Sequence, residues 1–237
     1  MRVLTVVHQP DAGAGEFGRQ AQADGHELIE WIPSNGGPPE LGVVDAAMVF
    51  GGAMHVDQEE SHPWLRPDKQ LIRQLLSRRT PVLGVCLGSQ LLAEAAGAAP
   101  HRASRPEIGW YRIQLTDHGQ ADPLLGELPR EFVGFGWHSY EWPLPPGGTA
   151  LAASDACLQS FRLGDAPAWG LQFHAEVSRD DLWGWLDKYD ADEDAVRLGI
   201  DPEAIRAESE SRIADWNQLG RGIAARFLRQ AGDATRA

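Results

Sequence analysis

The first half of the chain alternates between short apolar runs and amphipathic stretches, which is the pattern of β-strands that are each followed by a helix. The apolar runs predict strands over residues 3–7, 26–32, 46–50 and 81–85. The stretches between and after them predict helices over residues 17–23, 64–79 and 87–96. Strands and helices in this order predict an α/β fold with a mostly parallel sheet flanked by helices.

The pattern changes after Gly97, which is placed to cap the helix before it. Strand-like runs follow over residues 108–116, 131–137, 150–154, 158–163 and 168–174, separated by turns that contain Pro and Gly. Strands without helices between them predict an antiparallel or mixed β extension. Past Ser178 the chain becomes helical and acidic, and a final amphipathic helix is predicted from about residue 202 to residue 231. We expect residues 1–178 to form one domain and residues 179–237 a helical extension packed on it, with a docking surface as the alternative use of the last helix.

A cysteine follows one of the buried strands at a place where the chain must turn sharply. The run from Pro81 to Gln90 reads P-V-L-G-V-C-L-G-S-Q, so that Cys86 has a glycine two residues before it and another two residues after it. This is the thiol version of the G-x-S-x-G elbow, in which the nucleophile sits on a strand-to-helix turn. The turn places the sulfur at the first turn of a helix, whose dipole favours a thiolate. We therefore expect Cys86 to be a nucleophile.

A base and a carboxylate lie near the end of a later apolar strand. His174 and Glu176 are two residues apart, so on an extended segment their side chains point the same way. Such a pair supplies a general base and the group that orients it. A buried thiol or a half-buried histidine is the ordinary interpretation of either residue alone, but the elbow glycines and the His-x-Glu sequence occur together here.

Acyl chemistry also needs hydrogen-bond donors for the oxyanion that develops during attack. The N–H of Leu87, which follows the nucleophile, is one expected donor. The glycines after the third predicted strand are placed to supply the second donor, and we favour Gly52 over Gly51 for this role. Gln90 lies one helical turn after Cys86 and faces the same side.

Two other patterns are weaker. Gly13, Gly15 and Gly18 fit the G-x-G-x-x-G nucleotide-binding sequence, but five residues separate the first of them from the preceding strand, where a tight turn is needed. His55, Asp57 and His62 are scattered and are interpreted as loop residues. We expect neither a metal nor a cofactor.

Composition excludes several classes of partner. The chain of 237 residues has 43% hydrophobic residues and a net charge of −13, which argues against nucleic acid and against an anionic membrane surface. No apolar run approaches the ~20 residues of a spanning helix, and the N-terminal run is too short for a signal peptide. Cys86 and Cys157 do not make a disulfide scaffold, and Cys157 is interpreted as a structural thiol. A cysteine nucleophile must stay reduced, which fits the cytoplasm.

Two of these segments carry a resemblance to a known family. G-V-C-L-G-S-Q at residues 84–90 resembles the G-x-C-x-G-x-Q signature of the class I (triad) glutamine amidotransferases, and L-Q-F-H-A-E at 171–176 resembles their Q-F-H-x-E signature. The resemblance covers roughly residues 1–178. It implies a flavodoxin-like α/β sheet with Cys86 as nucleophile, His174 as base and Glu176 as its orienting carboxylate. It also implies that the glycine loop at 50–54 belongs to the oxyanion hole and that Gln90 helps to hold the substrate amino acid.

The resemblance extends to the segment F-G-W-H-S-Y-E at residues 135–141. In the family such a W-H-S segment lines the glutamine pocket, which implies substrate contacts for His138, Ser139 and Tyr140. His138 is not expected to be the catalytic base, because no carboxylate lies two residues after it. The segment E-I-G-W at 107–110 also resembles the family and is assigned to packing.

The function that the resemblance implies is hydrolysis of the side-chain amide of L-glutamine through a thioester on Cys86. The ammonia would go to an acceptor, usually on a synthetase that is fused to or paired with the glutaminase, and no synthetase segment is present in this sequence. The chain looks most like stand-alone, GMP synthase-like members. The alternatives are a γ-glutamyl hydrolase or peptidase that uses the same triad, and a non-catalytic regulatory subunit.

Overall fold

The sheet is continuous and has a parallel half and an antiparallel half. The computed structural model describes residues 1–164 and 166–235, and in them nine strands pair in the order β2-β1-β3-β4-β9-β8-β7-β5-β6. The parallel half consists of β1 (Arg2–Val6), β2 (Glu27–Trp31), β3 (Ala46–Val49), β4 (Val82–Val85) and β9 (Ala168–Leu171). The antiparallel half consists of β5 (His101–Leu115), β6 (Glu131–Glu141), β7 (Gly148–Ala153) and β8 (Leu158–Leu163). The predicted α/β class with an antiparallel extension is confirmed.

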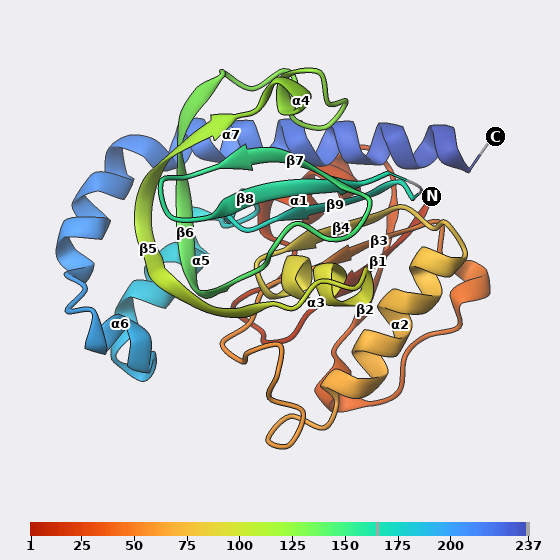
Figure 1. Ribbon diagram of the computed structural model, residues 1–237, viewed down its shortest axis with the longest axis horizontal. Helices are drawn as coiled ribbons and strands as arrows, with labels where there is room; N and C mark the ends of the chain where they lie inside the picture. Colours follow the sequence, from red (N-terminus) through yellow and green to blue (C-terminus); the bar gives the residue numbers. More distant parts are fainter. Residues whose placement is uncertain (165, 236–237) are drawn as a thin grey trace.

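Helices cover both faces of the parallel half, as Figure 1 shows. On one face lie α1 (Gly15–Ala23), α5 (Arg179–Asp187) and the long α7 (Pro202–Ala234). On the other lie α2 (Leu65–Ser77) and α3 (Leu87–Ala95). The short helices are α4 (Asp117–Gln120), α6 (Glu193–Arg197) and the 3-10 turns Pro33–Asn35, Leu41–Val43 and Tyr189–Ala191. The inner parallel strands β1, β3, β4 and β9 are therefore buried on both sides, which explains their largely apolar sequences, whereas β2 at the edge of the sheet exposes Glu27 and Glu30.

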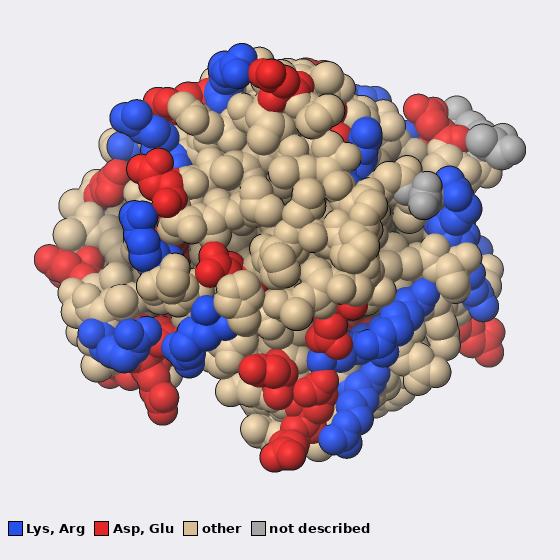
Figure 2. All heavy atoms as spheres, viewed as in Figure 1, with Lys and Arg blue, Asp and Glu red and all other residues tan. Residues whose placement is uncertain are grey.

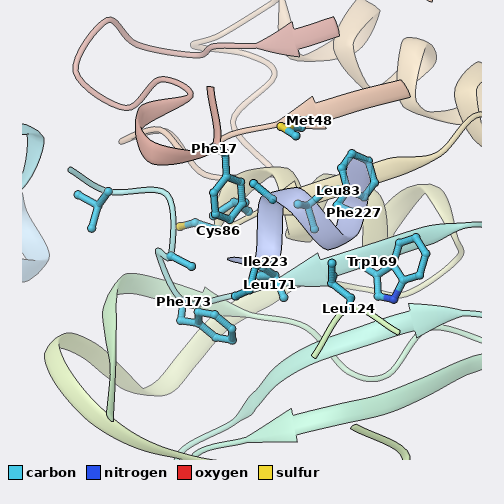
Figure 3. Packing of buried hydrophobic residues seen from close by; sticks show 14 of the residues in the cluster. Phe17, Met48, Leu83, Cys86, Leu124, Trp169, Leu171, Phe173, Ile223 and Phe227 are labelled. Atoms are coloured by element: carbon cyan, nitrogen blue, oxygen red, sulfur yellow. The ribbon is translucent and has the colours of Figure 1, made fainter. Parts of the chain in front are cut away.

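Two apolar cores result, one on each face of the sheet. Phe17 of α1, Phe227 of α7 and Leu83 of β4 belong to the first, and Figure 3 shows Cys86 beside this cluster, next to Phe17. Leu75 of α2 and Leu91 of α3 belong to the second. Cys86, the expected nucleophile, is therefore itself packed against hydrophobic side chains.

Several boundaries differ from the expected ones. β9 ends at Leu171, so the prediction that this strand reaches His174 is wrong. β5 begins at His101 and β6 continues to Glu141, which makes both strands longer than expected. α7 extends to Ala234, because Ile223, Phe227 and Ala231 stay buried against the sheet along its second half. The division into residues 1–178 and 179–237 stays a prediction, although α7 packs along α1.

Charge is distributed unevenly over the surface. Figure 2 shows an uncharged central area over β7 and β8, with acidic and basic side chains gathered toward the sides and the lower edge of this view. Within the described residues, no helix combines the length and the apolar character needed to cross a membrane.

Candidate active site

The turn after β4 has the geometry of a nucleophile elbow. Cys86 has φ 50° and ψ −113°, a conformation that costs on the order of 1–3 kcal/mol for a residue with a side chain. A Cβ on Gly84 would lie 2.5 Å from the carbonyl oxygen of Gly88, and a Cβ on Gly88 would lie 2.0 Å from that of Val49. Both elbow glycines are therefore required by close approach of the backbone. Ser89 holds the turn from inside, since its hydroxyl donates to the Cys86 carbonyl at 2.7 Å.

The histidine and the glutamate meet in the loop after β9. His174 Nδ1 lies 2.6 Å from Glu176 Oε1, and both side chains are 3% exposed. The pair forms although the segment is not a strand, because the His174 N–H donates to the Phe135 carbonyl at 2.8 Å and fixes the loop beside β6. A carboxylate on Nδ1 leaves Nε2 as the nitrogen that can exchange a proton with another group.

The charge state of His174 follows from its neighbours. Burial lowers the pKa of the imidazole, but the Glu176 carboxylate and the Cys86 sulfur raise it by more, so that the pKa lies well above the ordinary value of 6.5. A protonated imidazole beside a thiol stabilises the thiolate form of the sulfur. The three groups can therefore provide a nucleophile and a proton donor together.

The C-terminal helix supports this loop from behind, which the sequence did not indicate. Trp216 Nε1 donates to the His174 carbonyl at 2.8 Å, and Asn217 Nδ2 donates to the Val177 carbonyl at 2.7 Å. A Cβ on Gly220 would lie 1.9 Å from the Ala175 carbonyl oxygen, so α7 approaches the loop as closely as the backbone allows. The predicted final helix thus packs on the catalytic loop by one face.

The glycine-rich stretch at residues 13–18 also packs against the loop after β9. The Glu16 N–H donates to the Glu176 carbonyl at 2.7 Å, and a Cβ on Gly15 would lie 2.1 Å from the same oxygen. The Glu16 side chain is buried and pairs with Arg19 and Arg221. The glycines therefore let α1 begin directly against the Glu176 segment.

The expected oxyanion donors lie beside the nucleophile. Gly52 and Leu87 both line the cleft that contains Cys86 and His174. A Cβ on Gly51 would lie 3.1 Å from His174 Cε1 and 3.5 Å from Cys86 Cβ, so the glycine loop passes directly beside these two side chains. Among the described residues, the N–H groups of Gly51, Gly52 and Leu87 donate to no protein acceptor.

The residues expected to contact the substrate line the same cleft, but their side chains bind different partners. Gln90 is buried, and its amide nitrogen lies 3.5 Å from the Tyr140 carbonyl and 3.4 Å from Gln172 Oε1. The Tyr140 hydroxyl donates to Asp57 Oδ2 at 3.1 Å, and its ring stacks on His55 at 4.2 Å. Tyr140 thus forms part of the outer wall of the cleft.

Both ring nitrogens of His138 have partners other than Cys86. Its Nδ1 donates to the Tyr140 carbonyl at 3.0 Å, and its Nε2 lies 3.2 Å from Glu107 Oε2, so it has a carboxylate partner after all, from another strand. Cys157 lies 3.7 Å from the same oxygen, and its pKa is raised to about 12, by burial first and then by Glu107. The three ligand-type atoms lie within 4.8 Å of one another, a group that spacing along the sequence did not predict. The Gln159 amide nitrogen donates to the Glu107 oxygen at 2.6 Å, so the Glu107 carboxylate in this cluster already has hydrogen-bond partners.

The cleft continues well beyond the triad. Its volume is about 520 Å³, and its outer part is lined by residues of α6 and of the loop after β3. Asp192 Oδ2 accepts from Trp137 Nε1 at 2.8 Å, and Asp194 accepts from Arg102 at 2.8 Å, which ties α6 to the antiparallel half. The pKa of Asp194 is lowered to about 2, because hydrogen bonds from Ser139, Arg197 and Arg102 outweigh its desolvation.

Sequence reasoning misses this outer wall. It treats the acidic stretch at residues 187–194 only as part of the helical extension, and His55 and His62 as plain loop residues, yet residues of all these segments line the cleft. Their charge and polarity are visible in the sequence. Nothing local shows that a segment about a hundred residues after the nucleophile folds back over it.

Comparison with known proteins agrees with the geometry. Residues 31–181 match the family model described as glutamine amidotransferase class-I. A putative glutamine amidotransferase-like protein of Salmonella typhimurium is 32% identical over 225 residues, which cover 92% of each chain. A solved structure of a glutamine amidotransferase from Thermotoga maritima is 28% identical, covers 96% of this chain and 98% of its own, and has a TM-score of 0.85.

Two further relatives differ in what their names say. A glutamine-hydrolysing GMP synthase subunit of Saccharolobus solfataricus is 32% identical over 63% of this chain and 76% of its own length. A γ-glutamyl-L-1-hydroxyisopropylamide hydrolase of a Pseudomonas species is 28% identical over 65% of this chain and 56% of its own length. The named reactions of both relatives act at a γ-glutamyl amide.

Proposed function

Because the chain belongs to the class I glutamine amidotransferase family, we propose that it hydrolyses the side-chain amide of L-glutamine with Cys86 as nucleophile. The observation that carries the proposal is the strained elbow of Cys86 beside the buried His174–Glu176 pair. A thiolate placed next to a protonated imidazole can attack a carbonyl carbon and then supply a proton to the amine that leaves.

The reaction proceeds in two balanced halves. The Cys86 sulfur forms a bond to the amide carbon, and the N–H groups of Gly52 and Leu87 stabilise the negative oxygen that results. The carbon–nitrogen bond breaks as His174 gives its proton to the nitrogen, which leaves as ammonia. A water molecule then gives a proton to His174 and its oxygen to the thioester carbon, which releases glutamate and restores the thiolate. Glu176 keeps the imidazole in the orientation that both proton transfers need.

The side chains at the outer end of the pocket would hold the amino acid portion. We assign Gln90 and the segment His138, Ser139 and Tyr140 to this role, His138 through its backbone because its ring binds Glu107. The similarity to one component of a GMP synthase supports a synthetase partner that receives the ammonia. We place the protein in the cytoplasm, where a thiol nucleophile stays reduced.

The test is release of glutamate and ammonia from L-glutamine by the purified chain, with Cys86→Ala as the control. Release by the unaltered chain that is absent from the variant supports the proposal. Equal release by both proteins overturns it. A synthetase partner would show itself as a rise in turnover when the two proteins are mixed.

A second candidate, hydrolysis of γ-glutamyl amides with larger leaving amines, is favoured by the size of the cleft. Its volume of about 520 Å³ falls within the roughly 300–1,000 Å³ that hold drug-sized ligands, whereas free glutamine is far smaller. The similarity to the Pseudomonas hydrolase points the same way. A panel of γ-glutamyl alkylamides, assayed beside L-glutamine, decides between the two: a higher kcat/KM for the amides favours this second function.

A further inference from the structure

A buried histidine lies directly behind the glycine loop, outside the triad. His8 follows β1, and its side chain is completely buried. Its Nε2 lies 2.8 Å from Asp68 Oδ2 of α2, which is also completely buried, and its ring stacks on Trp64 with 5.7 Å between centroids. Contacts from the start of α2, one to Nε2 and one to the ring face, thus hold the ring in one orientation.

The other ring nitrogen faces the loop that carries the expected oxyanion donors. His8 Nδ1 lies 2.9 Å from the Phe50 carbonyl oxygen and 3.3 Å from that of Gly51. Carbonyl oxygens only accept, so Nδ1 must carry a hydrogen. The contact of Asp68 with the opposite nitrogen is compatible with this.

The direction of these two carbonyls determines the direction of the next two N–H groups. No peptide bond among the described residues is cis. In a planar trans peptide the C=O and the N–H point in opposite directions. Since the Phe50 and Gly51 carbonyls point toward His8, the N–H groups of Gly51 and Gly52 point away from it. Two successive N–H groups on one side of a turn form a concavity that binds anions.

The side of the loop opposite His8 is the catalytic side. A Cβ on Gly51 would approach His174 and Cys86, whereas a Cβ on Gly52 would lie 2.9 Å from His8 Cβ. The loop is therefore sandwiched between the His8 ring and the triad. From these contacts we propose that His8, fixed by Asp68, is a positioning residue that aims the Gly51 and Gly52 N–H groups at the oxyanion. The inference rests on the proposed function.

Two substitutions separate the two hydrogen bonds of the ring. The amide nitrogen of asparagine takes the position of Nδ1, so His8→Asn keeps a donor for the carbonyls and loses the contact with Asp68. The amide nitrogen of glutamine takes the position of Nε2, so His8→Gln keeps the contact with Asp68 and loses the donor. These variants each remove one side of the ring's hydrogen bonding, whereas His8→Ala removes both at once, leaves all three groups buried without this partner and threatens folding.

The first measurement is steady-state hydrolysis of L-glutamine and of a γ-glutamyl alkylamide. Loss of one oxyanion donor lowers kcat by about 10²–10³-fold in a comparable site. We expect His8→Gln to lose about 10²-fold in kcat with little change in KM, and His8→Asn to lose far less. Alkylation of Cys86 by iodoacetamide develops no oxyanion, so its rate should stay the same in both variants. Equal loss of kcat in the two variants, or slower alkylation in step with kcat, overturns the positioning role.

A second measurement is independent of catalysis and separates failure of this inference from failure of the proposed function. Hydrogen–deuterium exchange reports the order of the segment from residue 50 to residue 53 in the unliganded protein. We expect faster exchange there in His8→Gln than in His8→Asn, with unchanged exchange in α7. If the unaltered chain hydrolyses neither substrate, the proposed function fails, and the exchange result alone decides the role of His8. Equal exchange in the two variants overturns that role.

Discussion

The chain contains two sets of one cysteine, one histidine and one glutamate, and they make an instructive comparison. In the first, His174 pairs with Glu176 at 2.6 Å, and Cys86 stands on a strained elbow at the start of a helix. The set opens onto a cleft of about 520 Å³. The sulfur and the base therefore face a space that can hold a substrate.

The second set has the same residue types, but of its three members only His138 lines the cleft. His138 pairs with Glu107 at 3.2 Å, and Cys157 lies 3.7 Å from the same carboxylate. The Gln159 amide nitrogen also donates to the Glu107 carboxylate. Cys157 directly precedes strand β8 and does not stand at the start of a helix. Residue types alone therefore do not distinguish the two sets; the backbone turn at Cys86 and the cleft beside it do.

The largest expected difference between the sets is in catalysis. Cys86→Ala should lower kcat for glutamine by a factor on the order of 10⁴–10⁶, because no other group can form the thioester. Cys157→Ala should leave kcat nearly unchanged, since this thiol lies outside the cleft. Glutamate release by the two variants checks the contrast, and a comparable loss in both would remove the distinction between the sets.

The next largest effect is expected from substitution of the two glutamates. In Glu176→Gln the amide group of the new side chain no longer specifies the tautomer of His174, a change that costs as much as about 10⁴-fold in kcat in a related triad. Glu107→Gln should chiefly lower stability, because an altered buried hydrogen bond costs about 1–3 kcal/mol. Steady-state kinetics and urea denaturation on both variants test this. A larger kcat loss in Glu107→Gln would reverse the roles.

The thiols should differ in reactivity. The pKa of Cys157 is raised to about 12, by burial and by Glu107 and Glu141, so at pH 8 only about one thiol in ten thousand is ionised there. Brief iodoacetamide treatment of the folded protein should modify one thiol, and unfolding should make both available. Mass spectrometry of the unaltered chain, Cys86→Ala and Cys157→Ser identifies the site. Rapid labelling at Cys157 would contradict the raised pKa of this thiol.

The smallest expected effect is on stability as a function of pH. The folded pKa of His174 lies well above 6.5, so the stabilisation from its charge is fully present below pH 6.5 and is lost as the pH rises through the folded value. Glu176→Gln removes a main cause of the raised pKa and should flatten this decline. Urea denaturation at several pH values above 6.5 measures the difference. If the free energy of unfolding falls with pH equally in the two proteins, Glu176 is not what keeps His174 protonated.

Much of the parallel half is predictable from the sequence, and less of the rest. The strands around Leu4, Met48 and Leu83 are buried on both faces, so their apolar runs are continuous and easy to find. The expected ends of β9 and β6 are wrong, because tertiary contacts decide them: the His174 N–H donates to the Phe135 carbonyl beyond the end of β9, and β6 continues to Glu141 by pairing with β5.

The sequence by itself determined the elbow at Cys86 and the His-x-Glu pair, because both are local. Glycines on both sides of a cysteine, and a histidine two residues before a glutamate, can be found from neighbouring residues alone, although the tertiary bond between the His174 N–H and the Phe135 carbonyl fixes the loop that holds the pair. Only the tertiary structure decided that His138 faces Glu107, that α6 forms the outer wall of the cleft, and that His8 lies behind the glycine loop. These contacts join residues from distant strands and helices, and their geometry exists only once the sheet brings the ends of those elements together.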